Sequence, residues 1–197
     1  MKIIAPHIDP TATVSEQAEI GAGATIAAYA QVREYAVIGD HTSIGAGAQI
    51  DARAIIGAKV KVGEHASVVE GVSIADGVFI GAHVCFTNDL FPRAINLDGT
   101  FKRATDWEVI PSTVEYGATI CAGSVVRCGV IIGRFALIGT GSIITRDVAP
   151  HSLTTGSPAR HAGYVCRCGY MLERVHTEDG RLLSYCARCD QIRDITP

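Results

Sequence analysis

Three side chains in the middle of the sequence could do acid–base or hydrogen-bond chemistry: His65, His83 and Asn88. An imidazole titrates near neutral pH and suits a general base. Asn88 follows His83 by five residues, and its side-chain carbonyl could accept a hydrogen bond from an amine and fix its direction. Exposed histidines are also common surface residues, an explanation at least as good for His65. We therefore assign positioning to Asn88 and hold His83 as the candidate base.

Four of the seven cysteines form two close pairs near the end of the sequence: Cys166 and Cys168, and Cys186 and Cys189. The odd total argues against a disulfide framework, and paired close spacings favour a metal. A turn signal at 177–180 separates segments 171–175 and 181–185, which predicts a hairpin. Two cysteine pairs flanking a hairpin are the layout of a zinc ribbon, and four thiolates would close a structural zinc site. A reduced, metal-free tail is the alternative.

The rest of the chain is organised by a strict six-residue repeat of large apolar residues. Helices repeat every 3.6 residues and strands every 2, so a period of six over this length indicates stacked repeats. The repeat stops after Phe86 and resumes at Val114. Its members are Ile8, Val14, Ile20, Ile26, Val32, Ile38, Ile44, Ile50, Ile56, Val62, Val68, Ile74, Ile80, Phe86, Val114, Ile120, Val126, Ile132, Ile138 and Ile144.

Each hexad reads as a short strand followed by a turn. The residue two before each apolar position is usually Ala, Ser, Thr or Val, and strand residues two apart share a face, so both should point inward. Glycine often comes directly after the apolar residue, as at Gly39 and Gly63. Because glycine tolerates a positive φ, we expect these glycines to form the corners.

This pattern resembles the hexapeptide-repeat acyltransferases over about residues 8–160. The resemblance implies an all-β, left-handed parallel β-helix, in which three hexads close one triangular coil of 18 residues. We expect a repeat domain at 1–160 and a zinc-ribbon-like extension at 161–197.

A loop at 87–111 interrupts the repeat. Long excursions from a rigid scaffold are usually functional or disordered. Phe91, Phe101 and Trp107 give this one apolar anchors, which favours order against a partner surface. Arg93 could meet phosphate.

Residues 77–94, with Thr87-Asn88-Asp89 followed by Pro92-Arg93, resemble bacterial nucleotide-sugar N-acetyltransferases acting on UDP- or dTDP-linked 3-amino sugars. Residues 68–72 are similar to another stretch of that group, and 156–160 match the end of many hexapeptide acyltransferases. The resemblance implies a cytoplasmic homotrimer that uses acetyl-CoA in a pathway to a cell-surface glycan, such as lipopolysaccharide, or to a deoxysugar.

By position, the resemblance places Asn88 beside the sugar amine and places the acetyl-CoA site at Thr140, Gly141 and Arg160. The residues expected to contact the substrate are His65, Glu70, Asp89 and Arg93. UDP and dTDP, amines at C3 and C4, and acetyl and other short acyl groups all remain open.

Composition argues against several other classes. A net charge of -3 gives no general attraction to nucleic acid or an anionic membrane. No apolar run approaches the roughly 20 residues that span a bilayer. Residues 1–7 contain no continuous apolar stretch, so we expect no signal peptide and a cytoplasmic location.

Three alternative functions are weighed against N-acetyl transfer. O-acetylation of a sugar or antibiotic hydroxyl is the nearest, and would make His83 indispensable because a hydroxyl must lose its proton at attack. A γ-type carbonic anhydrase would need a His-x4-His pair, and the histidines of the repeat (His7, His41, His65, His83 and His151) contain none. A non-catalytic scaffold that docks through the loop is the third.

Overall fold

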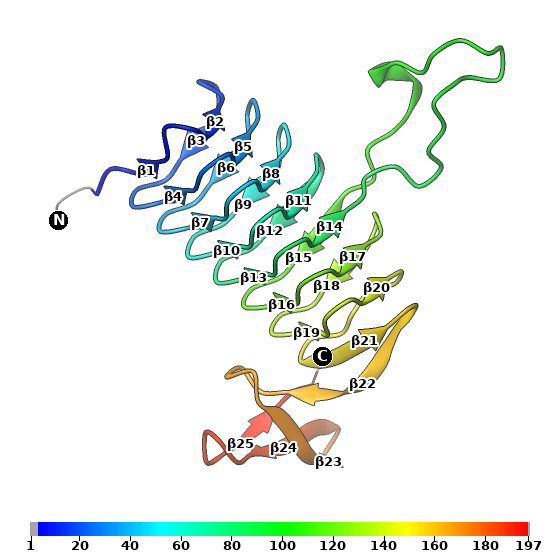
Figure 1. Ribbon diagram of the computed structural model, residues 1–197. Helices are drawn as coiled ribbons and strands as arrows, with labels where there is room; N and C mark the ends of the chain where they lie inside the picture. Colours follow the sequence, from blue (N-terminus) through cyan, green and yellow to red (C-terminus); the bar gives the residue numbers. More distant parts are fainter. Residues whose placement is uncertain (1–3, 197) are drawn as a thin grey trace.

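The chain winds through three parallel sheets in turn and forms a stack of three-sided coils (Figure 1). The computed structural model describes residues 4–196; residues 1–3, which belong to the segment judged unlike a signal peptide, lie outside this range. Strands three places apart in order pair side by side, and their residues are 18 positions apart, as in His7 with Thr25. The all-β, parallel coil is confirmed, while its left-handed winding stays a prediction.

We number the sheets in the order in which the chain visits them, and call the corners between them edge 1–2, edge 2–3 and edge 3–1. Sheet 1 holds β1 (His7–Ile8), β4 (Thr25–Ile26), β7 (Ser43–Ile44), β10 (Lys61–Val62), β13 (Phe79–Ile80), β16 (Thr119–Ile120) and β19 (Leu137–Ile138). Sheet 2 holds β2 (Thr13–Val14), β5 (Gln31–Val32), β8 (Gln49–Ile50), β11 (Ser67–Val68), β14 (Cys85–Phe86), β17 (Val125–Val126) and β20 (Ile143–Ile144). Sheet 3 holds β3 (Glu19–Ile20), β6 (Val37–Ile38), β9 (Ile55–Ile56), β12 (Val72–Ile74), β15 (Ser112–Val114) and β18 (Ile131–Ile132).

The repeat residues fill the interior of the coil, as predicted. From Ile26 to Ile144 every large residue of the repeat is buried, together with the small residue two positions before it. Ile8 is 40% exposed because the first coil has a neighbour on one side only. Thr42, a buried polar residue of this set, donates its hydroxyl to Gly57 O at 2.7 Å and accepts from Val60 N at 3.0 Å.

The prediction that the glycine after each apolar residue forms the corner through a positive φ is wrong. The positive φ lies two residues later, at positions such as Tyr29, His65 and Lys59 as well as glycines. A Cβ on Gly39 would instead lie 2.4 Å from the backbone carbon of Gly57 in the next coil. Glycine is required there because adjacent coils approach too closely for any side chain.

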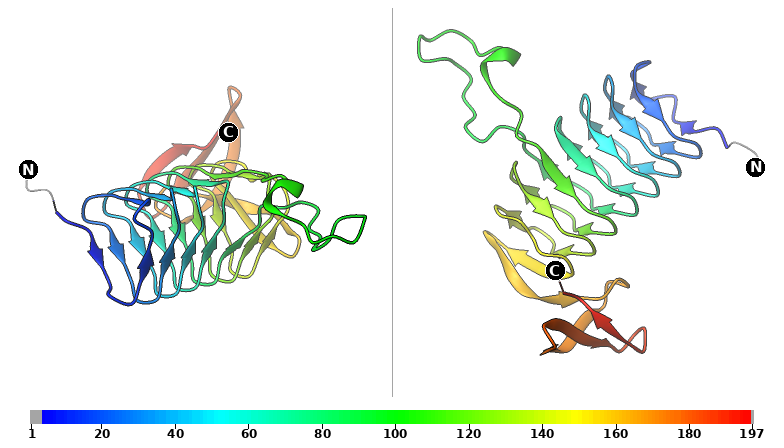
Figure 2. Two further views of the ribbon diagram at one scale, coloured as in Figure 1. Left: turned by 90° about the horizontal axis from the view of Figure 1, so that it is seen from above. Right: turned by 180° about the vertical axis from the view of Figure 1, so that it is seen from behind.

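The loop leaves the coil at edge 2–3 without disturbing the strands on either side. Val72 pairs with Ser112, 40 positions on, where coils without the loop pair 18 positions apart, so 22 residues are inserted. The loop contains the short helix η1 (Ala104–Asp106) and projects away from the coil (Figure 2). Phe91 and Phe101 are each 78% exposed. These predicted anchors therefore leave their apolar surfaces open rather than packing on their own coil.

The C-terminal tail continues sheet 1 with antiparallel strands. They are β21 (Ser152–Gly156), β22 (Ala159–Val165), β23 (Met171–Glu178), β24 (Arg181–Cys186) and β25 (Gln191–Asp194). β23 and β24 form the predicted hairpin, with positive φ at Asp179 and Gly180. Two consecutive positive-φ residues suit the twist of a tight hairpin.

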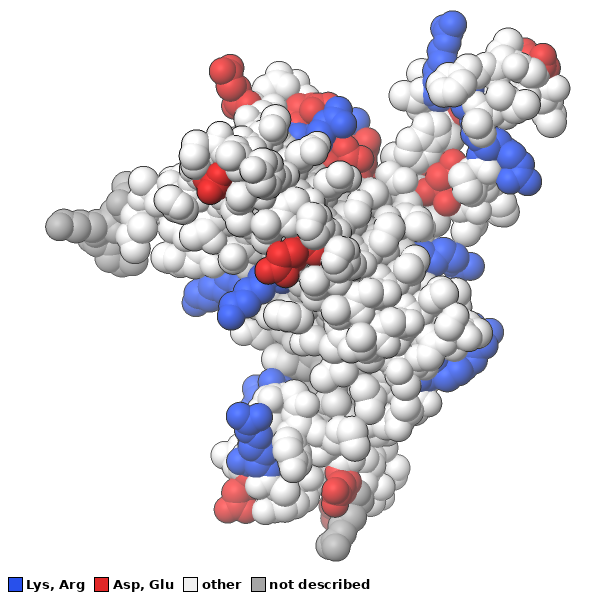
Figure 3. Space-filling view, in the orientation of Figure 1, with Lys and Arg blue, Asp and Glu red and all other residues white. Residues whose placement is uncertain are grey.

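Charged side chains are scattered over the surface, and the flank of the coil seen in Figure 3 is largely uncharged. Within residues 4–196 no helix is long and apolar enough to cross a membrane.

Candidate active site

His65 and His83 lie on edge 1–2 in successive coils, as their spacing of 18 predicts. Their rings stack with centroids 5.2 Å apart and planes at 16°. Each occupies the positive-φ corner, and the His83 N–H donates to Glu64 O at 2.9 Å, which fixes the backbone. His65 also covers Gly47, where a Cβ would lie 2.5 Å from the imidazole Nδ1. The pair is exposed, so a substrate can reach it.

The same edge is bare on the C-terminal side of His83. Gly123 and Gly141 hold the next two corners, and a Cβ on either would meet no atom within 4 Å. The Gly141 N–H already donates to Ala122 O at 2.9 Å, whereas no residue of the described range accepts from the Thr140 N–H. Thr140 therefore presents the amide that can donate to a ligand at this corner.

Cys121 lies beside Thr140 on edge 1–2 but is not prepared to act as a nucleophile. Burial raises the pKa of the Cys121 thiol, and a hydrogen bond with the Thr140 side chain opposes this effect. The thiol form therefore persists at neutral pH, and the thiolate is the reactive form.

Asn88 lies at edge 2–3, where the loop begins. Its Nδ2 donates to Glu70 O at 3.3 Å, and its backbone carbonyl accepts from Ile110 N at 2.9 Å, so Asn88 ties both ends of the loop to the coil. Among the described residues none donates to Asn88 Oδ1. The half-buried side chain thus keeps an acceptor available.

The other predicted substrate contacts are divided between local bonds and solvent. The Glu70 carboxylate accepts from Arg53 Nε at 2.7 Å. Asp89 Oδ1 accepts from the Phe91 N–H at 2.8 Å, which closes a tight turn. Arg93 donates to Pro92 O at 2.9 Å and is exposed.

The structure does not bring His83 and Asn88 together within one chain. β14 lies between them, with His83 at edge 1–2 and Asn88 at edge 2–3. His65, His83, Thr140 and Gly141 share one edge, while Glu70, Asn88 and Asp89 share the other. A site that contains both groups requires a second copy of the chain.

Arg160 lies apart from Thr140 and Gly141. It belongs to β22 and lines a cleft of about 390 Å³ together with Arg146, Asp147 and Tyr164. Its Nη1 donates to Ala159 O at 2.9 Å. The guanidinium is exposed at the cleft and can meet a charged group there.

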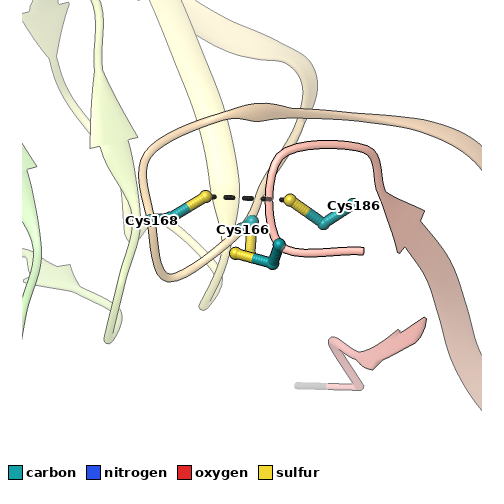
Figure 4. Close-up of side chains that lie close together, drawn as sticks. Cys166, Cys168 and Cys186 are labelled. Carbon is teal, nitrogen blue, oxygen red and sulfur yellow. Dashed lines mark hydrogen bonds between the residues drawn. The ribbon is translucent and has the colours of Figure 1, made fainter. Parts of the chain in front are cut away.

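The four tail cysteines converge on one point. All four Sγ atoms lie within 4.8 Å of one another, with 3.9 Å between Cys166 and Cys189 and 3.7 Å between Cys168 and Cys186 (Figure 4). These separations are far longer than a disulfide bond of about 2.05 Å. Four sulfurs held about 2.3 Å from a tetrahedral zinc would be about 3.8 Å apart, so the cluster has the right size.

The metal-free cluster ionises unevenly. Burial opposes ionisation of Cys166, but hydrogen bonds from the Cys168 N–H and neighbouring side chains outweigh it and lower the pKa to about 6. At Cys168 the Tyr170 N–H favours the thiolate, yet burial and the neighbouring thiols raise the pKa to about 11. Thiolates crowded together repel one another, and a bound cation would remove that repulsion.

A family model described as bacterial transferase hexapeptide (six repeats) matches residues 17–52. These residues lie in the regular coils, where each hexad forms one side. The chain is a hexapeptide-repeat protein.

Known hexapeptide proteins resemble it over parts of the sequence. It is 45% identical over 65 residues to the dTDP-3-amino-3,6-dideoxy-alpha-D-galactopyranose 3-N-acetyltransferase of Aneurinibacillus thermoaerophilus, a match that covers 33% of this chain and 34% of that one. It is 32% identical over 85 residues to serine acetyltransferase of Escherichia coli K12, covering 43% and 30%. The chain thus spans about a third of the length of these relatives. The crystal structure of the BC4754 gene product of Bacillus cereus shares the fold, with TM-score 0.53, 20% identity, and 79% and 78% coverage.

Two local contacts of this hexapeptide protein could not be assigned from the repeat alone. Thr87 occupies the position after Phe86 where other hexads have glycine, and its Oγ1 accepts from the Cys128 N–H at 3.0 Å. That departure from glycine was the available signal. Arg53, which binds Glu70, looks like an ordinary corner residue in the sequence.

Proposed function

We propose that this chain transfers an acetyl group from acetyl-CoA to the amino group of a nucleotide-linked amino sugar. The observation that carries the proposal is the 45% identity over 65 residues to a dTDP-amino-sugar 3-N-acetyltransferase. Glycan or deoxysugar synthesis in the cytoplasm is the setting that we predict for this reaction.

Edge 1–2 suits the thioester. The bare corners at Gly123 and Gly141 would let an extended cosubstrate lie along the coil, and the Thr140 N–H would donate to the carbonyl oxygen as it gains negative charge. The amine nitrogen attacks the carbonyl carbon, the C–S bond breaks, and CoA leaves as a thiolate. The proton lost by the amine passes to His83 or to that thiolate. Arg160, away from this corner, would meet a more distant charged part of the cosubstrate.

A homotrimer would complete the site. Because His83 and Asn88 occupy opposite ends of β14, the loop of one copy has to approach edge 1–2 of its neighbour. The exposed Phe91 and Phe101 give the loop apolar surface for that contact. Asn88 Oδ1 would then orient the amine, with His65, Glu70, Asp89 and Arg93 around the sugar and its phosphates.

The test is a thiol-release assay with acetyl-CoA and a panel of UDP-, dTDP- and GDP-linked sugars, in amino and hydroxyl forms. Turnover with amino sugars only is the expected result. Turnover with hydroxyl sugars alone would establish O-acetyl transfer instead. Absence of turnover together with absence of CoA binding would refute the proposal in favour of a scaffold.

Replacing His83 with alanine should lower kcat by roughly 10- to 100-fold if the imidazole acts as the base, since general-base catalysis contributes about 10²–10⁴-fold. The acidic limb of the pH–kcat profile should disappear in the same variant. H65A is the matched control, because it removes the stacked neighbour but leaves His83 in place. Full activity of H83A with an unchanged pH profile would show that the thiolate alone takes the proton.

We also propose that Cys166, Cys168, Cys186 and Cys189 bind one structural zinc ion in an extension at residues 161–197. The size of the sulfur cluster supports this, and four protein ligands leave no position for catalysis. A metal-free tail would make the cysteines incidental.

Metal analysis of purified protein should find one zinc per chain, and C186S should retain less than about a tenth of it because Cys186 is the fully buried ligand. C128S is the control, since Cys128 is buried in the coil, outside the cluster. Equal zinc contents in the two variants would disprove the site.

A further inference from the structure

A second cavity, of about 510 Å³, lies where the tail meets edge 3–1 of the coil. The coil contributes residues from the corners after β18 and before β21, and the tail contributes the segment between its first cysteine pair and residues of β25. The lining consists of Arg134, Phe135, His151, Arg167, Ile192, Arg193, Asp194 and Thr196.

The cavity carries more positive charge than its own residues neutralise. Within residues 4–196 the guanidinium groups of Arg134 and Arg167 make no hydrogen bond or ion pair, and the buried Nε of Arg193 has no partner. Asp194 is the carboxylate of the lining, and it already accepts from the Thr196 N–H and hydroxyl at 3.0 and 2.6 Å. Three cations that share a concave site without counter-charge form an electrostatic trap for an anion.

One wall of the cavity is aromatic and uncharged. The Phe135 and His151 rings stack with centroids 5.3 Å apart and planes at 28°. His151 is held by its Nδ1, which bonds Val165 O at 2.9 Å. Burial lowers the pKa of His151, the bond to Val165 opposes this, and the charges of Arg134 and Arg167 lower it further. The imidazole is therefore neutral near pH 7, Nδ1 is the donor to Val165, and Nε2 can accept a hydrogen bond.

We propose that this cavity binds a phosphate-bearing anion of about the size of pyrophosphate, held by Arg134 and Arg167 and contacted by Arg193. Guanidinium groups match phosphate oxygens with paired, charge-assisted hydrogen bonds. The site is distinct from the proposed acetyl-CoA site, because β19 separates the Phe135 corner from the Gly141 corner. Its ligand would join the coil to the tail, since Arg134 belongs to the first and Arg167 to the second.

The experiment is calorimetric titration of the full-length protein with sodium pyrophosphate at low ionic strength, with inorganic phosphate as a second probe. We expect one pyrophosphate per chain. R134Q and R167Q should each weaken binding by about tenfold or more, because each removes a charge-assisted hydrogen-bond pair. R127Q is the matched control: Arg127 is exposed at edge 2–3, far from this lining, and its replacement should change the affinity less than about twofold.

Thermal melting of each variant establishes that it is folded, and both arginines are exposed, so their replacement should leave the melting temperature unchanged. A parallel titration in saturating CoA separates the two phosphate sources. Unchanged pyrophosphate binding supports an independent site, whereas full displacement by CoA would overturn it and assign the arginines to the cosubstrate. Lack of pyrophosphate binding, with a change of oligomer mass in R134Q, would also overturn it, because the arginines would then pair with a neighbouring copy. Because the probe is pyrophosphate and not an amino sugar, failure here leaves the acetyltransferase proposal standing.

Discussion

Replacing Gly39 with alanine is expected to destabilise the coil by about 3 kcal/mol, near the upper end for overpacking. The added Cβ would lie 2.4 Å from Gly57 C, 2.5 Å from Ala58 N and 2.7 Å from Gly57 O. All three are backbone atoms of the next coil and cannot rotate away. The coils would have to separate locally, which weakens the strand pairing of β6 with β9. Thermal melting should show a midpoint lower by roughly 10 °C.

Gly123 provides the control for this substitution. Its φ of 69° makes alanine unfavourable, but the new Cβ would meet no atom within 4 Å. Only the backbone cost of about 1 kcal/mol should remain. Equal destabilisation by G39A and G123A would show that conformation, rather than close approach of the coils, explains the glycine of the hexad.

Replacing Asn88 with alanine is expected to lower kcat/KM for the amino sugar about a hundredfold. The substitution removes the Oδ1 acceptor and also the Nδ2 bond to Glu70 O, so the amine loses its orientation and the loop loses one anchor. A displacement of about 1 Å at a reacting group can cost about 10²-fold. Steady-state kinetics with the sugar as the varied substrate measures the loss, while the Kd for CoA should stay unchanged because Asn88 lies on edge 2–3.

T87V separates the two effects in N88A. Thr87 Oγ1 anchors the same end of the loop through the Cys128 N–H at 3.0 Å, but it offers nothing to the amine. We expect T87V to lose less than about tenfold in kcat/KM, since it removes one neutral hydrogen bond. If T87V were as impaired as N88A, Asn88 would be an anchor of the loop and not a substrate contact.

The period of six was sufficient to predict the coil, its 18-residue length and its interior. Burial of positions such as Ile26 and Ile144 follows from spacing alone, since any other winding would expose them. The role of glycine was not predictable in the same way. A residue such as Gly39 can be selected for a positive φ or for close approach, and only the position of the next coil separates these causes.

The candidate site shows a second limit of spacing. His83 and Asn88 are five residues apart in the sequence, yet a strand between two corners sends them to different edges. Likewise, Thr140 and Gly141 are adjacent, but only the hydrogen bond of Gly141 to Ala122 reveals which N–H is engaged. The arginine-lined cavity joins residues from 134 to 193, so no local pattern could have indicated it.

The 22-residue insertion at edge 2–3 has a consequence for how the chain folds. Neighbouring coils normally close a chain segment of 18 residues, whereas β12 must find β15 across 40. The added loop-closure entropy is about 0.7 kcal/mol for this one pairing. Stacked repeats can nucleate anywhere and grow by adding neighbours. The coils before and after the loop should therefore grow as two separate zippers, and the joining of β12 to β15 should be the step that sets the folding rate of the whole stack.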